Sequence, residues 1–109
     1  MMKVDVLGTE YTLVEVTEDT DTTIAGRDGY CDTSIKMCAI DKMENKGENA
    51  KKNLQEYKKT VKRYELIHAF LYESGLDNCC YWAENEEMVD WLAIQFPKML
   101  KAFQDVDAI

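Results

Sequence analysis

The sequence predicts an α+β fold, in which a small antiparallel sheet of three or four strands packs against two helices. Residues 1–41 contain short runs rich in β-branched and aromatic residues with turn residues between them, which is typical of strands. Residues 48–104 instead carry apolar side chains three and four positions apart, which is typical of helices. At 109 residues the chain is long enough for one hydrophobic core, so we expect a single domain over residues 1–109.

Two hairpins are expected in the β-rich half. Residues 4–7 and 11–16 are β-rich runs separated by a short segment that contains glycine, a spacing that favours a hairpin. Residues 17–23 are polar and acidic without periodicity, which indicates an exposed loop. Residues 25–32 and 34–40 follow as a second pair of strand segments, and they complete the predicted sheet.

Two helices are expected in the second half. The first covers residues 48–74, and Gly75 follows it where a left-handed C-cap is favoured. The second covers residues 84–96 and is kinked or ended by Pro97, which has no N–H to donate; a short turn or helix then spans 98–103. We expect the interface between helices and sheet to contain Phe70, Leu71, Trp82, Trp91, Leu92 and Phe96.

The charge balance restricts the possible partners. The formal net charge is -8, whereas nucleic-acid surfaces are built from clustered Lys and Arg, so we expect no nucleic-acid binding. An acidic protein that mimics DNA toward a basic partner is a weaker alternative. No apolar run reaches the length of a membrane span, and residues 1–5 lack the apolar block of an export signal. A cytoplasmic protein that does not enter membranes is therefore expected.

Four cysteines, Cys31, Cys38, Cys79 and Cys80, could form disulfides or bind metal. They lack the C-x-x-C spacing of zinc ribbons and redox motifs. Without an export signal, reduced and partly buried thiols are the favoured interpretation. Capture of a soft metal by Cys79 and Cys80 is a minor alternative.

Residues 64–68 read Tyr-Glu-Leu-Ile-His, which matches the zinc-peptidase motif H-E-x-x-H except at its first position. In the complete motif two histidines four residues apart share a helix face and bind one metal, while the glutamate polarises a water. Here Tyr64 replaces the first histidine, and Glu65 and His68 remain. A lone histidine on an apolar stripe is more often a core residue than a ligand, so the short motif alone is weak.

A second acidic group at residues 84–90 strengthens the metal hypothesis, because a zinc site needs a third protein ligand. If the second helix packs antiparallel on the first, Glu86 can face His68. Asp90, one turn further on, would then accept a hydrogen bond from the histidine ring. The alternative is that Glu84, Glu86 and Glu87 form an acidic first helical turn that offsets the macrodipole.

Three strings in this order, DGYCD, RYELIHAFLYESGL and NEEMVDWLAIQFPK, resemble a family of small zincin-like proteins of phages and bacteria. The chain is more remotely similar to the ImmA/IrrE-type metallopeptidases. The resemblance implies a minimal zincin-like fold, a Zn²⁺ cofactor and a peptide or protein substrate. It places His68 at the second histidine ligand, Glu65 at the general base and Glu86 at the downstream ligand, with Glu87 as its rival. Tyr64 falls at the first-ligand position and departs from the family pattern.

Three consequences of Tyr64 compete. In order of preference, the metal is lost, it binds weakly through His68, Glu86 and waters, or Tyr64 or a nearby cysteine completes an altered site. We therefore expect a metallopeptidase-related domain of phage or prophage type with weakened or absent zinc peptidase activity. The alternative is a non-catalytic interaction module, a pseudo-enzyme that binds a host or phage protein.

Overall fold

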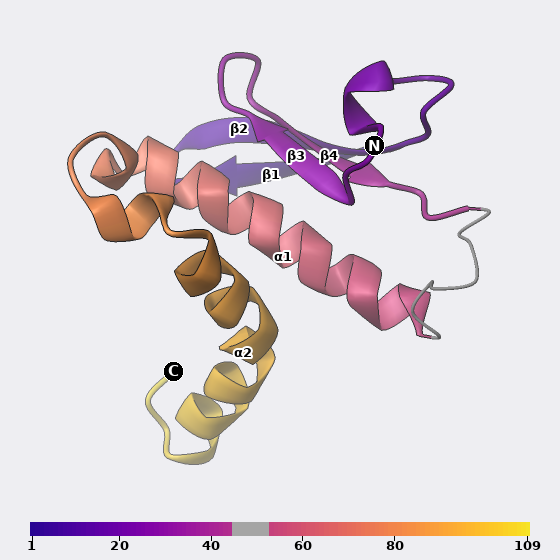
Figure 1. The fold of residues 1–109 in the computed structure, drawn as a ribbon. Helices are drawn as coiled ribbons and strands as arrows, with labels where there is room; N and C mark the ends of the chain where they lie inside the picture. Colours follow the sequence, from indigo (N-terminus) through magenta and orange to yellow (C-terminus); the bar gives the residue numbers. More distant parts are fainter. Residues whose placement is uncertain (45–52) are drawn as a thin grey trace.

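Four strands and two long helices make up the protein, which confirms the predicted α+β fold (Figure 1). The structure is a computed structural model that describes residues 1–44 and 53–109. The strands are β1 (Met2–Val6), β2 (Thr9–Val16), β3 (Gly29–Asp32) and β4 (Met37–Asp41). The helices are α1 (Leu54–Glu73) and α2 (Glu86–Asp105), and the short 3-10 helices are η1 (Thr22–Ile24), η2 (Leu76–Asn78) and η3 (Tyr81–Glu84).

Both predicted hairpins are present. β1 and β2 pair antiparallel around the two-residue turn Leu7–Gly8, in which both residues have positive φ. Two positive φ angles in a two-residue loop match the right-handed twist of the flanking strands. β3 and β4 also pair antiparallel, and Cys31 lies opposite Cys38.

The sheet is mixed, so the prediction of an all-antiparallel sheet is wrong at one pair of strands. Its order is β1-β2-β4-β3, and β2 pairs parallel with β4. The connection over residues 17–28 lets the chain cross to the far edge before β3 begins. β4 then returns to the middle of the sheet, where Cys38, Ala39 and Ile40 are fully buried. A continuous apolar run of this kind is typical of an interior strand.

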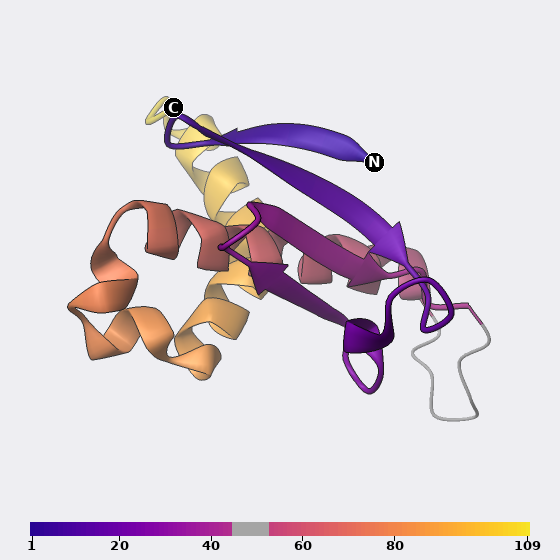
Figure 2. The same ribbon diagram turned by 90° about the horizontal axis from the view of Figure 1, so that it is seen from above.

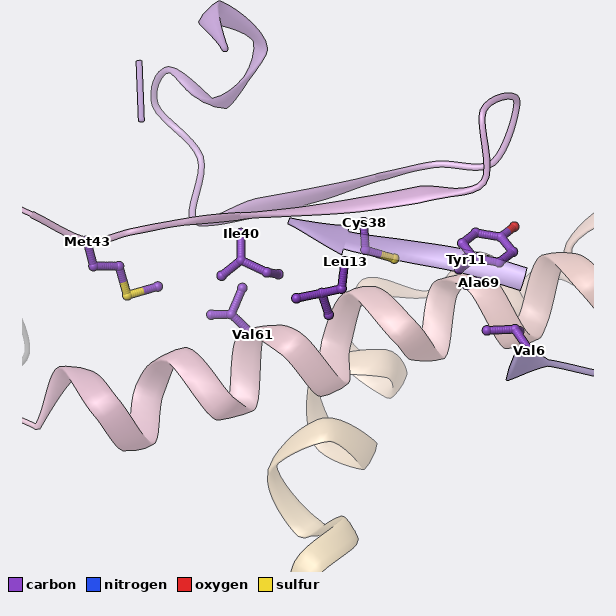
Figure 3. Packing of buried hydrophobic residues seen from close by; sticks show 8 residues of the cluster. All are labelled: Val6, Tyr11, Leu13, Cys38, Ile40, Met43, Val61 and Ala69. Carbon is purple, nitrogen blue, oxygen red and sulfur yellow. The ribbon is translucent and has the colours of Figure 1, made fainter. Parts of the chain in front are cut away.

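α1 lies across one face of the sheet and closes the main core (Figures 1 and 2). It begins after Asn53, whose side chain accepts a hydrogen bond from the Glu56 N–H, and it ends before Gly75, which has the expected left-handed φ. The predicted start at residues 48–52 lies outside the described residues. Figure 3 shows the buried cluster between sheet and helix: Val6, Tyr11, Leu13, Cys38, Ile40, Met43, Val61 and Ala69.

α2 packs against α1 and leads away from the sheet (Figure 1). It begins at Glu86, where the Asn85 side chain accepts a hydrogen bond from the Met88 N–H at 2.9 Å. Val89 and Ala93 are its buried residues, and they lie on one side of the helix.

The predicted aromatic interface is wrong in most of its members. Phe70, Trp82, Trp91 and Phe96 are exposed, Leu92 is partly buried, and Leu71 is buried. The reason is that α1, and not α2, packs on the sheet, so α2 contributes to a smaller second cluster around Leu71, Ala83 and Val89.

The predicted break at Pro97 does not occur, because α2 continues through it to Asp105. Proline removes the N–H that would donate to the Ala93 carbonyl four residues earlier. The Arg63 side chain replaces that donor, with its Nε 2.7 Å from the Ala93 oxygen. In the part of the chain that the structure describes, no helix combines the length and apolar character needed to cross a membrane.

Candidate functional site

Two adjoining cavities, each of about 450 Å³, form a cleft bordered by α1, α2 and the start of β3. They share Gly29, Tyr64, Glu65 and Glu86. We call the first the acidic cavity, because its lining includes the carboxyl groups of Asp28, Glu65, Glu86, Glu87 and Asp90. We call the second the histidine cavity; its lining includes His68 together with Arg27, Tyr30, Tyr72 and Asp77.

Glu65 lies on the side of α1 that faces the sheet and is only 5% exposed. Gly29 of β3 makes this position possible. A Cβ on Gly29 would lie 3.1 Å from Glu65 Oε2 and 3.0 Å from both the Ala39 oxygen and Val61 Cγ1. Only a residue without a side chain lets β3 approach the carboxylate so closely.

Burial raises the pKa of Glu65 to about 7, and the positive charge of Arg27 offsets part of this rise. The cause is the cost of holding a carboxylate away from water. Glu65 lines both cavities, and no fully buried side-chain oxygen or nitrogen among the described residues lacks a hydrogen-bond partner, so its carboxyl oxygens are open to the cleft. Glu65 therefore titrates near neutral pH, which is the range that suits a general base.

His68 and Glu86 meet across the two helices. The His68 Nε2 lies 3.6 Å from Glu86 Oε1, and the Tyr64 ring packs edge-on against the imidazole at a centroid distance of 4.8 Å. Burial lowers the pKa of His68, and the nearby Asp77 offsets part of that effect. The ring is therefore mainly neutral at pH 7, and its contact with Glu86 is a polar contact rather than a full ion pair.

Glu87 and Asp90 line the acidic cavity, whereas His68 lines only the histidine cavity. Asp90 acts on Tyr57, whose pKa is raised to about 12 by burial, by its hydrogen bond to Asp28 and by the charges of Asp28 and Asp90. The structure thus places Glu86 beside His68 and Asp90 beside Tyr57. Among the described residues no contact joins Asp90 to the histidine ring, so that role stays a prediction, and the nearby charge of Asp77 acts to raise the pKa of His68.

The donor set falls short of a zinc site. His68 and Glu86 converge, but a structural or catalytic zinc uses at least three protein ligands. Over residues 1–44 and 53–109, no three His, Cys, Asp or Glu side chains are grouped so that they could hold a metal ion. Tyr64, which stands at the first position of the H-E-x-x-H spacing, contributes a ring contact to His68. The described residues therefore do not fit a complete zinc centre.

The four cysteines take no part in the contact between His68 and Glu86. Cys31 lines the histidine cavity, and its Sγ is 3.6 Å from that of Cys38. The hydrogen bond to Cys31, together with burial, raises the pKa of Cys38. Cys79 and Cys80 line a different cavity beside η2 and η3.

Sequence reasoning missed three residues of the cleft. Gly29 is the residue at which β3 approaches Glu65 closely. Arg27, in the loop before β3, and Asp77, in the short helix η2, shift the pKa values of Glu65 and His68 from segments that carry no periodic signal. The DGYCD string was the available clue to Gly29, since it places the glycine beside the first residue of a strand.

Comparisons with family models, with curated proteins and with solved structures found no match for this chain.

Proposed function

We propose that this protein is a zincin-like domain related to metallopeptidases, of the type carried by phages and bacterial mobile elements, in which Tyr64 weakens metal binding. One observation carries the proposal. The buried Glu65 and the His68–Glu86 pair come from two neighbouring helices and open into one cleft. The motif spacing on α1 and the resemblance of three sequence strings support the same conclusion.

The chain's own residues supply acid–base chemistry in this cleft. Glu65 has a pKa near 7, so both protonation states are populated at neutral pH. A carboxyl group of this kind can take a proton from a water in the cleft and return it to a leaving group. His68 and Glu86 border the same space and provide a neutral imidazole and a carboxylate for binding a polar group.

Metal analysis of the wild type and of Tyr64→His tests the proposal. After dialysis against buffer with trace zinc, we expect well below one zinc per wild-type chain and close to one per chain in Tyr64→His. The variant should also cleave an unfolded protein such as casein, and adding Glu65→Gln should abolish cleavage while zinc is retained. Absence of zinc from both proteins would contradict the proposal.

A non-catalytic interaction module is the second candidate, and the surface of α2 favours it. Phe96 and Phe103 lie seven residues apart on one side of the helix and are 45% and 39% exposed. Exposed apolar groups on one face often mark a protein interaction site. In this case chelator-treated protein should keep the thermal midpoint of untreated protein, and Tyr64→His should neither gain zinc nor cleave casein.

A further inference from the structure

The acidic cavity has a charge pattern that the proposed acid–base chemistry does not explain. Five carboxyl groups line it, and no Lys, Arg or His is found among its described lining residues. Glu87 and Asp90 form no hydrogen bond or ion pair with another described residue, and neither contacts His68. A concentration of like charges in one concave site attracts a cation.

Glu65 gives a second and independent indication of a ligand. The residue is only 5% exposed, and its carboxyl group faces the cavity and accepts no hydrogen bond from a described residue. Buried polar groups in native proteins are nearly always hydrogen-bonded. The carboxyl oxygens of Glu65 are open to the cavity and are not fully enclosed, so their donor is a water or a molecule that enters the cleft.

The size and the walls of the cavity favour an organic cation over a metal ion. A volume of about 450 Å³ lies within the usual range for organic ligands, roughly 300 to 1,000 Å³. Among the described residues, the carboxyl groups are not close enough together to form a metal-binding group. Tyr57 and Tyr64 also contribute aromatic surface to the walls.

Guanidinium fits this combination better than ammonium does. It is planar, it donates two parallel hydrogen bonds to a carboxylate, and it stacks on aromatic rings. Five donors can serve several carboxyl groups at once, whereas a lysine ammonium has three.

We propose that the acidic cavity is a binding site for an arginine side chain of a peptide or protein, held by Glu65, Glu87 and Asp90 and flanked by Tyr57 and Tyr64. The inference rests on the proposed function in one respect, namely that the cleft receives a peptide segment. The further step is that this segment carries an arginine. The histidine cavity adjoins the site and would face a neighbouring residue of the same segment.

Binding of short blocked peptides to the wild-type chain, with chelator present, tests the site. The probes are acetyl-Gly-Arg-Gly-amide, the same peptide with citrulline, which has a similar shape but no charge, and the lysine analogue. We expect saturable binding of the arginine peptide by calorimetry or amide chemical shifts. The citrulline peptide should bind at least tenfold more weakly, and the lysine peptide at least threefold more weakly.

Matched variants separate the cavity from general charge attraction. Glu87→Gln and Asp90→Asn should each weaken the arginine peptide at least fivefold, and Glu65→Gln provides a third variant. Glu84→Gln removes the same charge nearby but outside the acidic cavity, and it should change affinity less than twofold. Equal binding of arginine and citrulline peptides, equal losses in Glu84→Gln and Asp90→Asn, or displacement of the peptide by millimolar Ca²⁺ at the same carboxyl groups would overturn the inference.

This outcome is independent of the zinc experiment. Arginine-selective binding together with absence of zinc from Tyr64→His would retain the arginine site and reject the metallopeptidase relationship. Zinc in Tyr64→His without arginine-selective binding would retain the metallopeptidase relationship and reject the arginine site.

Discussion

Arg63 of α1 donates a hydrogen bond to the main-chain oxygen of Ala93 in α2, at 2.7 Å. Ala93 is fully buried, and its carbonyl is the one that Pro97 leaves without an N–H partner. A side chain from one helix thus repairs the hydrogen-bond pattern of the other. The same contact fixes α2 against α1, and this packing positions Glu86 beside His68.

Arg63→Met should destabilise the protein by about 1 to 3 kcal/mol, because it leaves a buried carbonyl without a donor while keeping much of the aliphatic stem. In a Pro97→Ala background the loss should be clearly smaller, since the substituted alanine provides the missing N–H within the helix. Urea unfolding of the four proteins measures the difference. Equal losses in both backgrounds would show that Arg63 acts through its charge or packing and does not compensate for Pro97.

Glu73 should make the free energy of unfolding fall at acidic pH. Its carboxylate accepts hydrogen bonds from Tyr11 at 2.7 Å, Lys36 at 2.9 Å and Thr9 at 3.1 Å, and the first two of these bonds are the largest causes that lower the pKa of Glu73 below 4.5. A folded-state pKa below the unfolded value means that the stabilisation is present above about pH 4.5 and is lost as pH falls through the folded pKa. Glu73→Gln should therefore flatten the loss of stability on acidification.

Urea unfolding between pH 3 and pH 7 checks the expectation for Glu73. Glu10→Gln is the matched control, because Glu10 forms an exposed ion pair with Lys3 at 3.2 Å. The control should keep the wild-type pH profile. An unchanged profile for Glu73→Gln would show that this cluster contributes nothing to acid sensitivity.

Glu65 should have the opposite pH dependence. Its folded pKa, near 7, lies above the unfolded value of 4.5, so the associated stability is fully present below about pH 4.5 and is lost as pH rises through 7. In metal-free protein, Glu65→Gln should be close to neutral at pH 4.5 and stabilising by on the order of 2 kcal/mol at pH 8.5. Thermal unfolding in chelator at both pH values measures this, and a variant that is less stable at pH 8.5 would contradict it.

Gly29→Ala should destabilise the protein by about 1 to 3 kcal/mol, because the added methyl group overpacks the space between β3 and α1. Its neighbours would be the Ala39 oxygen and Val61 Cγ1, both at 3.0 Å, together with the Glu65 carboxyl group. Gly26→Ala offers a contrast, because nothing lies within 4 Å of a Cβ there and only its positive φ opposes the change. Only Gly29→Ala should alter the titration of Glu65, followed by carboxyl NMR.

The strongly patterned elements were predictable from sequence. The β1–β2 hairpin, the end of α1 at Gly75 and the place of Glu65 and His68 on α1 follow from local spacing, whereas the contact of Glu86 with His68 also needs α2 to pack on α1. These features depend on residues a few positions apart or on one helix pairing, and such information is carried by periodicity and turn residues.

The features that the sequence did not predict depend on partners that are distant in the chain. The parallel pairing of β2 with β4 depends on a crossover that turn chemistry does not encode. The continuation of α2 beyond Pro97 depends on Arg63, which lies 34 positions earlier in the chain. Trp91 and Phe96 are exposed because α1, and not α2, packs on the sheet, whereas their apolar character predicted a place in the core.

We propose that Glu86 and His68 are the surviving pair of a metal site whose third position is now Tyr64. The most direct test is the zinc affinity of Tyr64→His, measured by competition with a chelator, with Glu86→Gln or Glu87→Gln added. We expect Glu86→Gln to weaken zinc binding at least tenfold and Glu87→Gln to change it less than threefold. Equal losses in the two variants, or no zinc binding by Tyr64→His, would contradict it.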